Sequence, residues 1–308
     1  MGSDDRAQHD ASLLLMRHRF DMATAAEIEA VWARGSGAAS GAGARAPEPL
    51  HKRFSRKASM AKLDGRIAVV TGAASGIGHG IAAAFAREGA DVAVVDQAGP
   101  EQAAGVLAEI GAAGRRGLFV RCDVSDEAAV RSMAGQVQAG LGPVDILVNN
   151  AGIFTQSLLE DMPVADWDRV LNVNLRAVFL CTRVLLGPML DRGWGRIINI
   201  ASQLGQIGGI EAVHYSASKA GVIGLTKALA REVSHRGVLV NAIAPGPIQT
   251  PLLDGETEEW RSAKLAELPM RRFGTVAEVT PTAVLLASSD GDYYAGQTLG
   301  PNGGDVML

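Results

Sequence analysis

The sequence predicts a single doubly wound α/β domain with three layers and a parallel sheet of about seven strands. Three observations predict this fold. From residue 66 onward, short runs rich in Val and Ile alternate with segments whose apolar residues recur at helical spacing. The strand-like runs are apolar on both faces, as in parallel sheets that helices cover on both sides. A glycine-rich turn follows the first run, where such folds bind dinucleotide phosphates.

Strands and helices are predicted to alternate from residue 66 to residue 243. The first helix follows the first strand, since Ile77, Ile81, Ala84 and Phe85 recur at helical spacing. The pattern locates six strands, at residues 66–71, 91–96, 117–123, 144–149, 196–201 and 238–243. It locates helices at residues 76–88, 100–112, 127–139, about 163–191 and 215–234.

The first sixty residues differ from the rest and are predicted to be a flexible extension, with the dinucleotide-binding and catalytic domain at 61–308. A helix-like stretch at 13–32 precedes a Gly, Ala and Ser-rich linker at 35–49 and a basic run at 51–57, interpreted as a solvated tail. A secretory signal is not expected, because the apolar core is short and is followed by Arg17 and Arg19.

Composition and charge exclude several classes of protein. The chain has 308 residues, 47% of them apolar, a net charge of −4 and a pI near 5.9. We therefore expect no nucleic-acid partner and no membrane association. Its two cysteines form no CxxC motif and stand beside no His cluster, so neither a disulfide nor a metal site is predicted. A cytoplasmic, reducing location fits this cysteine usage.

The turn from Thr71 to Gly78 has the spacing GxxxGxG and lies between a strand and a helix. Glycines allow the backbone to approach a diphosphate, and the free N–H groups of the helix start attract its charge. A merely tight turn is the alternative. The predicted cofactor contacts in this turn are Gly72, Ser75, Gly76, Ile77 and Gly78.

Acidic residues follow the second and third strands. Asp96 ends the second strand, where a carboxylate can accept hydrogen bonds from the adenosine ribose hydroxyls. It can equally be a turn residue or a helix cap. Asp123 and Val124 end the third strand and are expected beside the adenine. Asp123 could instead cap the next helix, although Ser125 is the better candidate for that cap.

Tyr215 and Lys219 stand four residues apart on a predicted helix, so both project from one face. Tyrosine titrates near 10 in water, which is too high for a base at neutral pH. We expect the ammonium to lower that pKa and to make Tyr215 a general acid/base. Ser202 ends the fifth predicted strand at the ligand edge, where its hydroxyl can hold the substrate oxygen.

Together these residues resemble the short-chain dehydrogenase/reductase family. The matching motifs are Thr71–Gly78, Asn149-Asn-Ala-Gly152, Asn172-Val-Asn174, Ser202, Tyr215-x3-Lys219 and Pro245-Gly246. By this resemblance, Asn174 positions a water that relays the proton, and Lys219 also holds the nicotinamide ribose. The resemblance further implies cofactor contacts from Asn150, Ala151, Gly152, Pro245, Gly246, Ile248 and Thr250.

The resulting functional prediction is an NAD-dependent oxidoreductase that interconverts a small or medium secondary alcohol and a ketone. An alternative within the same family is an NADPH-consuming 3-oxoacyl-acyl-carrier-protein reductase, which residues 271–274 and 294–300 resemble. Such reductases tend to carry Arg where this chain has Ser75. A non-catalytic, cofactor-sensing protein is the alternative from another class, and the complete set of catalytic residues disfavours it.

NAD is predicted over NADP because Asp96 would face the extra phosphate. Allowing for solvent, the repulsion between the two charges corresponds to about a tenfold difference in affinity. No Arg or Lys stands at Ser75 or Gln97, and neither Arg87 nor Arg121 is expected at a phosphate-reading position. NAD preference further suggests a bias toward alcohol oxidation.

The substrate side is predicted less completely. Residues 252–272, which include Trp260, are expected to form a lid, and a mixed pocket is expected from Ile153, Phe154, Gln203, Leu204 and His214. An exposed loop is nevertheless the favoured place for His214. His79 and His235 are expected at the surface, Cys181 in the core, and Asn149 in a structural role. Surplus apolar residues on two helices suggest a homotetramer: Val178, Phe179, Val184, Leu185, Val222, Ile223, Leu225 and Leu229.

Overall fold

The computed structural model describes residues 61–251, 253–255 and 257–307. The helix expected at 13–32, the linker and the basic run lie outside the described residues. Within the described part, strands and helices alternate as the sequence predicts, and the doubly wound three-layer fold is confirmed.

The centre of the domain is a seven-stranded parallel sheet in the order β3-β2-β1-β4-β5-β6-β7. The strand order reverses direction between β1 and β4, and ligands bind beyond the carboxyl ends of strands at such a reversal. The strands are β1 (Ile67–Thr71), β2 (Asp91–Asp96), β3 (Gly117–Arg121), β4 (Ile146–Asn149), β5 (Gly195–Ile200), β6 (Val238–Ile243) and β7 (Thr298–Leu299).

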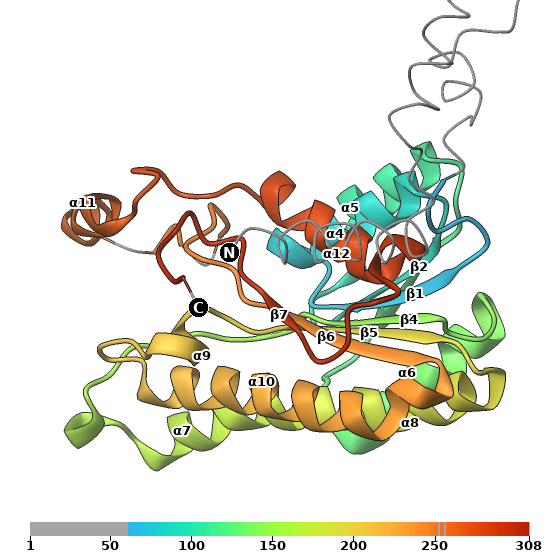
Figure 1. The fold of residues 1–308 in the computed structure, drawn as a ribbon, viewed down its shortest axis with the longest axis horizontal. Helices are drawn as coiled ribbons and strands as arrows, with labels where there is room; N and C mark the ends of the chain where they lie inside the picture. The colour runs from blue at the N-terminus through green and yellow to red at the C-terminus, as the bar shows by residue number, and fades with distance from the viewer. Residues whose placement is uncertain (1–60, 252, 256, 308) are drawn as a thin grey trace, which may run out of the picture. The chain divides into compact units, whose positions relative to one another are not determined.

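Helices cover both faces of the sheet (Figure 1). One layer contains α4 (Gly76–Arg87), α5 (Pro100–Ala112) and α12 (Val276–Ala287). The opposite layer contains α6 (Glu127–Gly140), α7 (Val164–Leu171), α8 (Ala177–Arg192) and α10 (Val213–Val233). The sheet and its two layers enclose two large apolar clusters, one around Phe85 and the other around Met133 and Met189. Burial of these clusters on both sides fixes the strand ends that carry the site.

The long helix predicted at about 163–191 is three segments. A π-helical turn, η2 (Asn172–Arg176), separates α7 from α8 and carries the buried Asn174. Such turns occur mostly as local insertions at functional sites. By length and hydropathy alone, Val164–Arg192 could cross a membrane. In the fold, seven residues of α8 are buried, and most of them belong to the cluster against the sheet.

Several elements were not located from the sequence. The seventh strand, β7, has only two residues, and two short helical elements border the cleft, α9 (Leu204–Ile207) and α11 (Glu258–Glu267). Helix α12 contains Pro281, which conceals its helical pattern. Three short 3₁₀ turns complete the described elements: η1 (Leu159–Asp161), η3 (Ser234–Arg236) and η4 (Ser289–Gly291).

The predicted cap of α6 is wrong. Asp126, rather than Ser125 or Asp123, caps it by accepting hydrogen bonds from the N–H groups of Ala128 and Ala129. Asp123 instead accepts from the backbone N–H and the hydroxyl of Ser125, at 2.9 Å and 2.7 Å. The Asp123 carboxylate thereby holds the turn after β3 rather than the helix.

Candidate active site

A cleft of about 870 Å³ lies at the carboxyl ends of the strands. Turns that follow six of the strands line it, together with residues of α9, α10 and α11. The cleft brings together all of the predicted site residues except two. Those on its wall are Gly72, Ser75, Gly76, Ile77, Asp96, Asp123, Val124, Asn150, Ala151, Gly152, Ser202, Tyr215, Lys219, Pro245, Gly246, Ile248 and Thr250.

The two others, Gly78 and Asn174, are not among the residues that line the cleft. Gly78 packs the start of α4 onto the turn after β1, since a Cβ there would lie 2.3 Å from the Gly72 carbonyl oxygen. Gly72 itself has φ of +63°, and a Cβ on it would lie 2.8 Å from the Cα of Ala151. Both positions therefore require glycine. Gly78 shapes the turn and does not contact the cleft.

The start of α4 is suited to a phosphate group. Ser75 is its N-cap residue in an extended conformation, and its side chain makes no capping hydrogen bond. The first turn contains no acidic residue. The helix therefore presents N–H groups and the positive end of its dipole to the cleft, in the manner of dinucleotide-binding turns.

Asp96 is held firmly at the end of β2. Its two carboxylate oxygens accept hydrogen bonds from the N–H groups of Ala74 and Ala98, each at 3.0 Å. These bonds link β2 to the glycine-rich turn and fix the carboxylate beside the cleft. An orientation that backbone donors fix in this way suits recognition of a ribose hydroxyl.

The structure corrects the expectation for Arg121. The β2–β3 register pairs it with Asp96, and its Nε donates to the carbonyl of Gln97 at 3.2 Å. Gln97 lines the cleft. Sequence separation concealed this neighbour, because the 24 residues between Asp96 and Arg121 include a whole crossover helix. A cation therefore does lie beside the ribose-reading position.

Asn150 joins β4 to the glycine-rich turn. Its side-chain amide donates to the carbonyls of Thr71 and Gly72, both at 2.9 Å. The Thr71 hydroxyl accepts in return from the N–H groups of Asn150 and Ala151. Asn149 is buried and hydrogen-bonds to Thr182 and Asn199, which is the structural role expected of it.

Lys219 reaches the cleft from α10. Its ammonium donates to the carbonyl of Ile200 at 2.7 Å and lies 5.6 Å from the centroid of the Tyr215 ring. Burial lowers the pKa of Lys219 to about 8. Gly152 lies beside this ammonium: a Cβ there would be in ordinary contact with the Lys219 Nζ at 3.5 Å and would crowd the Asn174 Oδ1 at 3.3 Å.

The expectation for the pKa of Tyr215 is corrected in direction. Burial raises the pKa of the Tyr215 phenol, and a hydrogen bond with Ser202 opposes that rise. The Phe154 ring packs edge-on against Tyr215, with centroids 4.9 Å apart, and contributes to this apolar surrounding. A neutral phenol is therefore the stable form at neutral pH, and it is a proton donor.

Asn174 holds the turn that follows β4. Its Oδ1 accepts from the N–H of Ile153 at 2.8 Å, and its Nδ2 donates to the carbonyl of Ile153 at 2.9 Å and to the Ser218 hydroxyl at 3.3 Å. Ser218 in turn donates to the carbonyl of Tyr215. Asn174 thus connects the cofactor side of the cleft to the helix that carries Tyr215.

Both expectations for His214, a place in the substrate pocket and a place in an exposed loop, are wrong. It lies in α10, is fully buried, and its Nε2 is 2.7 Å from the Thr155 hydroxyl. It neither occupies an exposed loop nor lines the cleft. Burial lowers its pKa. The sequence also missed further cleft residues, whose positions depend on tertiary packing: Gln156, Val173, Ile207 and Ile210. Trp260, Lys264 and Glu267 belong to the segment predicted as a lid, and they too line the cleft.

The expectations for three other side chains are confirmed. His79 is partly exposed and lies 2.7 Å from Glu109, His235 is exposed, and Cys181 is buried. Among residues 61–251, 253–255 and 257–307, no three His, Cys, Asp or Glu side chains are grouped to hold a metal.

Comparison with known proteins agrees with this geometry. Residues 66–261 match the sequence model of the family described as short chain dehydrogenase. The chain is a short-chain dehydrogenase/reductase. It is therefore an oxidoreductase of a family that uses NAD or NADP.

Individual relatives align with the described domain. The chain is 41% identical over 240 residues to 3-oxoacyl-[acyl-carrier-protein] reductase FabG of Staphylococcus aureus, covering 78% of this chain and 98% of the relative. It is 43% identical over 249 residues to nodulation protein G of a Rhizobium species, covering 81% and 100%.

Two solved structures are similar in fold. A short-chain type dehydrogenase/reductase from Mycobacterium marinum has a TM-score of 0.78 at 35% identity, covering 81% of this chain and 99% of that one. A Beutenbergia cavernae protein assigned as an NAD(P)-dependent gluconate 5-dehydrogenase, with NADP bound, has a TM-score of 0.75 at 40% identity, covering 80% and 98%.

Proposed function

We propose that the chain interconverts a secondary alcohol and a ketone, with Tyr215 as the proton donor and acceptor. The observation that carries the proposal is the meeting of Ser202, Tyr215 and Lys219 in one cleft, on the substrate side of the phosphate-binding turn. The Ser202 hydroxyl is near enough to the Tyr215 phenol to lower its pKa, so one substrate oxygen can contact both hydroxyls.

Each of the three side chains has a different role, which follows from its position. Ser202 holds and polarises the substrate oxygen, and Tyr215 gives its proton to that oxygen during reduction. Lys219, fixed on the Ile200 carbonyl, supplies positive charge near the phenol. A bound nicotinamide exchanges the hydride with the substrate carbon. Because burial raises the pKa of Tyr215, reduction proceeds at neutral pH, whereas oxidation needs the phenolate and gains from alkaline pH.

NAD(H) is the proposed cofactor. The fixed carboxylate of Asp96 supports this choice, because it can accept from the ribose hydroxyls and repels a 2′-phosphate. Arg121 acts in the opposite sense, and the NADP in the Beutenbergia cavernae structure favours the phosphorylated cofactor. We therefore expect a moderate NAD preference that depends on both side chains.

The substrate-side wall favours a largely apolar alcohol or ketone. Ile153, Phe154, Leu204, Ile207 and Trp260 line it. The second candidate function is 3-oxoacyl-acyl-carrier-protein reduction, which the identity to the Staphylococcus aureus reductase favours. It requires the same catalytic side chains and differs in the substrate and in the use of NADPH.

A nicotinamide absorbance assay tests both candidates. Secondary alcohols and ketones are compared with a 3-oxoacyl thioester, each with NAD(H) and NADP(H), at neutral and alkaline pH. Turnover of simple ketones and alcohols supports the proposal, and turnover confined to the thioester with NADPH supports the second candidate. Tight cofactor binding without any turnover would favour a sensing protein instead.

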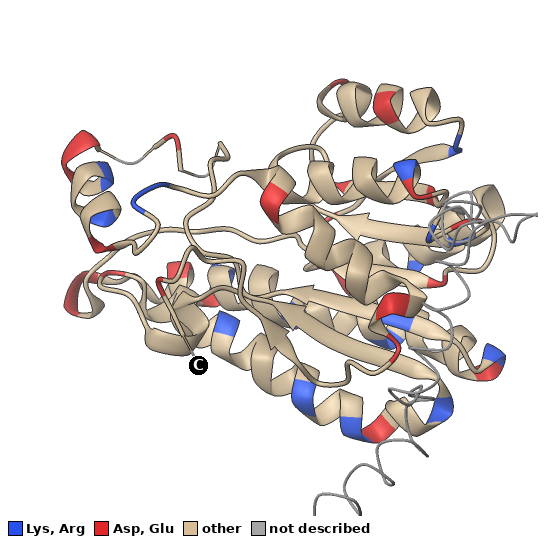
Figure 2. Cartoon of the chain, turned by 45° about the horizontal axis from the view of Figure 1, so that its top comes forward, with Lys and Arg blue, Asp and Glu red and all other residues tan. Residues whose placement is uncertain are grey.

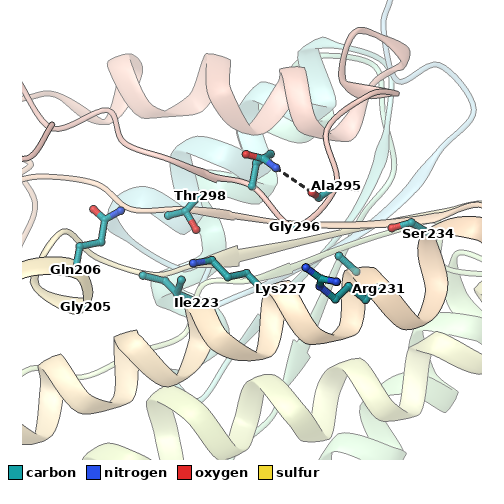
Figure 3. Close-up of a pocket in the computed structure, with 11 residues that line it drawn as sticks. Gly205, Gln206, Ile223, Lys227, Arg231, Ser234, Ala295, Gly296 and Thr298 are labelled. Carbon is teal, nitrogen blue, oxygen red and sulfur yellow. Dashed lines mark hydrogen bonds between the residues drawn. The ribbon is translucent and has the colours of Figure 1, made fainter. Parts of the chain in front are cut away.

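We further propose a cytoplasmic homotetramer. One support is Phe179, an apolar side chain that is half-exposed on α8. Val178, Leu185 and Val222 are buried within the subunit, so the exposed apolar surface is smaller than the sequence suggests. A second support is a groove of about 880 Å³ between α10 and the edge strand β7 (Figure 3). Lys227 and Arg231 line it, and neither is within 4.0 Å of a carboxylate of the described residues.

A second copy of the chain that covers this edge would provide partners for the edge strand β7 and for the cations of Lys227 and Arg231. Light scattering at micromolar concentration tests the proposal, and a stable monomer would refute it. Fractionation of cells tests the location. Both cysteines are free and buried, which suits a reducing compartment.

A further inference from the structure

The C-terminal segment passes between three parts of the site. Asn302 packs under the Pro245–Gly246 turn, since a Cβ on Gly246 would lie 2.7 Å from the Cα of Asn302. The Asn302 side chain accepts from the N–H of Gly304 at 3.0 Å and donates to the carbonyl of Val306 at 2.8 Å. These bonds fold the chain into a turn with Asp305 inside it.

Asp305 contacts both sides of the cleft entrance. Its carboxylate lies 2.7 Å from the Lys264 ammonium of α11 and accepts a hydrogen bond from the side-chain amide of Gln203. Gln203 directly follows Ser202 and is buried. One carboxylate therefore joins the C-terminal segment, α11 and the turn that carries Ser202.

This ion pair is shielded from solvent. The side chains of Asp305 and Lys264 are 9% and 16% exposed, whereas the Asp254–Arg261 pair on the same lid segment includes a carboxylate that is 77% exposed. Burial lowers the pKa of Lys264, but Asp305 and Glu267 raise it by more, so the ammonium keeps its charge. Shielded pairs contribute more than exposed ones.

Besides this ion pair, α11 has few contacts outside the helix: the Trp260 ring stacks on Phe273 with centroids 6.3 Å apart, and Arg261 donates to the carbonyl of Leu253. The helix contains no buried residue, and its Trp260 and Lys264 face the cleft. Figure 2 shows charged residues along it, acidic in the first turn and basic further on. A helix without a buried apolar face gains little from the hydrophobic effect, so its position depends on polar contacts such as this one.

We propose that Asp305 is a positioning residue that holds α11 over the substrate side of the cleft, through its ion pair with Lys264 and its hydrogen bond with Gln203. The proposal rests on the proposed function for its effect on turnover. Its effect on α11 itself does not require any activity. Asp305 does not line the cleft, whereas the two side chains that it holds, Gln203 and Lys264, do.

The test that is independent of activity is hydrogen exchange of the full chain, followed by mass spectrometry of peptides from α11. Asp305→Asn and Lys264→Met should each increase exchange in α11 about fivefold, and the double variant should add little more. Asp254→Asn is the matched control and should leave α11 exchange within twofold of wild type. Unchanged exchange in both single variants, or fully additive effects in the double variant, would overturn the proposal.

The catalytic readout uses whichever ketone of the assay panel is turned over with NADH. Asp305→Asn should raise KM about fivefold and leave kcat within twofold, because the Tyr215 site remains intact. Added salt should change KM little in wild type, because a shielded ion pair is screened much less than an exposed one. An equal loss of kcat with unchanged KM would overturn the positioning role. Absence of turnover in wild type would overturn the proposed function, while the exchange experiment would still decide the role of Asp305.

Discussion

The two sides of the cleft are built in different ways. The cofactor side consists of turns at the ends of central strands, cross-linked by partly buried hydrogen bonds such as those between Asn150 and Thr71. The substrate side consists of α9, which packs closely on α10, and of α11 and the C-terminal segment, which Asp305 joins to each other and to Gln203. The chemistry therefore rests on a cross-linked frame, whereas substrate choice rests partly on a helix, α11, that has no buried residue.

The largest expected effect concerns the cross-linked side. Tyr215→Phe removes the transferable proton and keeps the ring that packs against Phe154. Turnover should fall by about 10²–10⁴-fold, the usual loss for general acid/base catalysis. Circular dichroism and cofactor binding should match wild type. Near-normal turnover would show that the proton moves by another route.

Cofactor choice tests the same side with a smaller effect. Asp96→Ala should reduce the ratio of kcat/KM for NAD over NADP by about tenfold, because the repulsion of the 2′-phosphate is lost. Arg121→Gln should change that ratio in the opposite direction, since its guanidinium lies beside Gln97. A ratio that neither variant changes would mean that both residues are only structural.

Burial of Lys219 predicts a pH dependence of stability. Its pKa is about 8 in the folded chain and near 10.5 when unfolded, so the unfolded state binds more protons between these values. This residue therefore makes the free energy of unfolding rise with pH from about 8 toward 10, by at most about 1.4 kcal/mol per pH unit. Denaturant titrations of wild type and Lys219→Met should differ by this slope, and parallel profiles would contradict it.

The smallest expected effect is that of removing residues 1–59. A chain that starts at Met60 keeps the whole described domain, and the expected change in turnover is less than twofold. Activity and solubility of the shortened chain are the measurements. Aggregation or a large loss of activity would mean that the extension packs on the domain or on a subunit interface.

How much of the site could be predicted from the sequence depends on whether local or long-range contacts place each residue. Gly72, Tyr215 and Lys219 were found because a turn and a helix fix their geometry over a few residues. Arg121 was misplaced because strand register brings it to Asp96 across a crossover helix. The Gln203–Asp305 contact joins residues 102 apart, and no local pattern encodes such a pair.

The sequence also does not predict how deeply a side chain is buried or how burial changes its pKa. The spacing of Tyr215 and Lys219 predicts a lowered pKa for the phenol, but desolvation by the folded chain raises that pKa, and Ser202 is the group that opposes the rise. His214 was assigned to the surface because histidine is polar, and its hydrogen bond with Thr155 permits its burial. Residue spacing predicts which groups meet, whereas burial decides how they titrate.

Transfer of a labelled hydride tests the central claim most directly. The wild-type chain is incubated with a ketone of the panel and a reduced nicotinamide that carries deuterium at both C4 positions, and the alcohol product is analysed by mass spectrometry. We predict one deuterium on the carbinol carbon from one face of the nicotinamide, with none lost to water, and no labelled product from Tyr215→Phe on the same timescale. An unlabelled alcohol, or label released to solvent, would contradict the account.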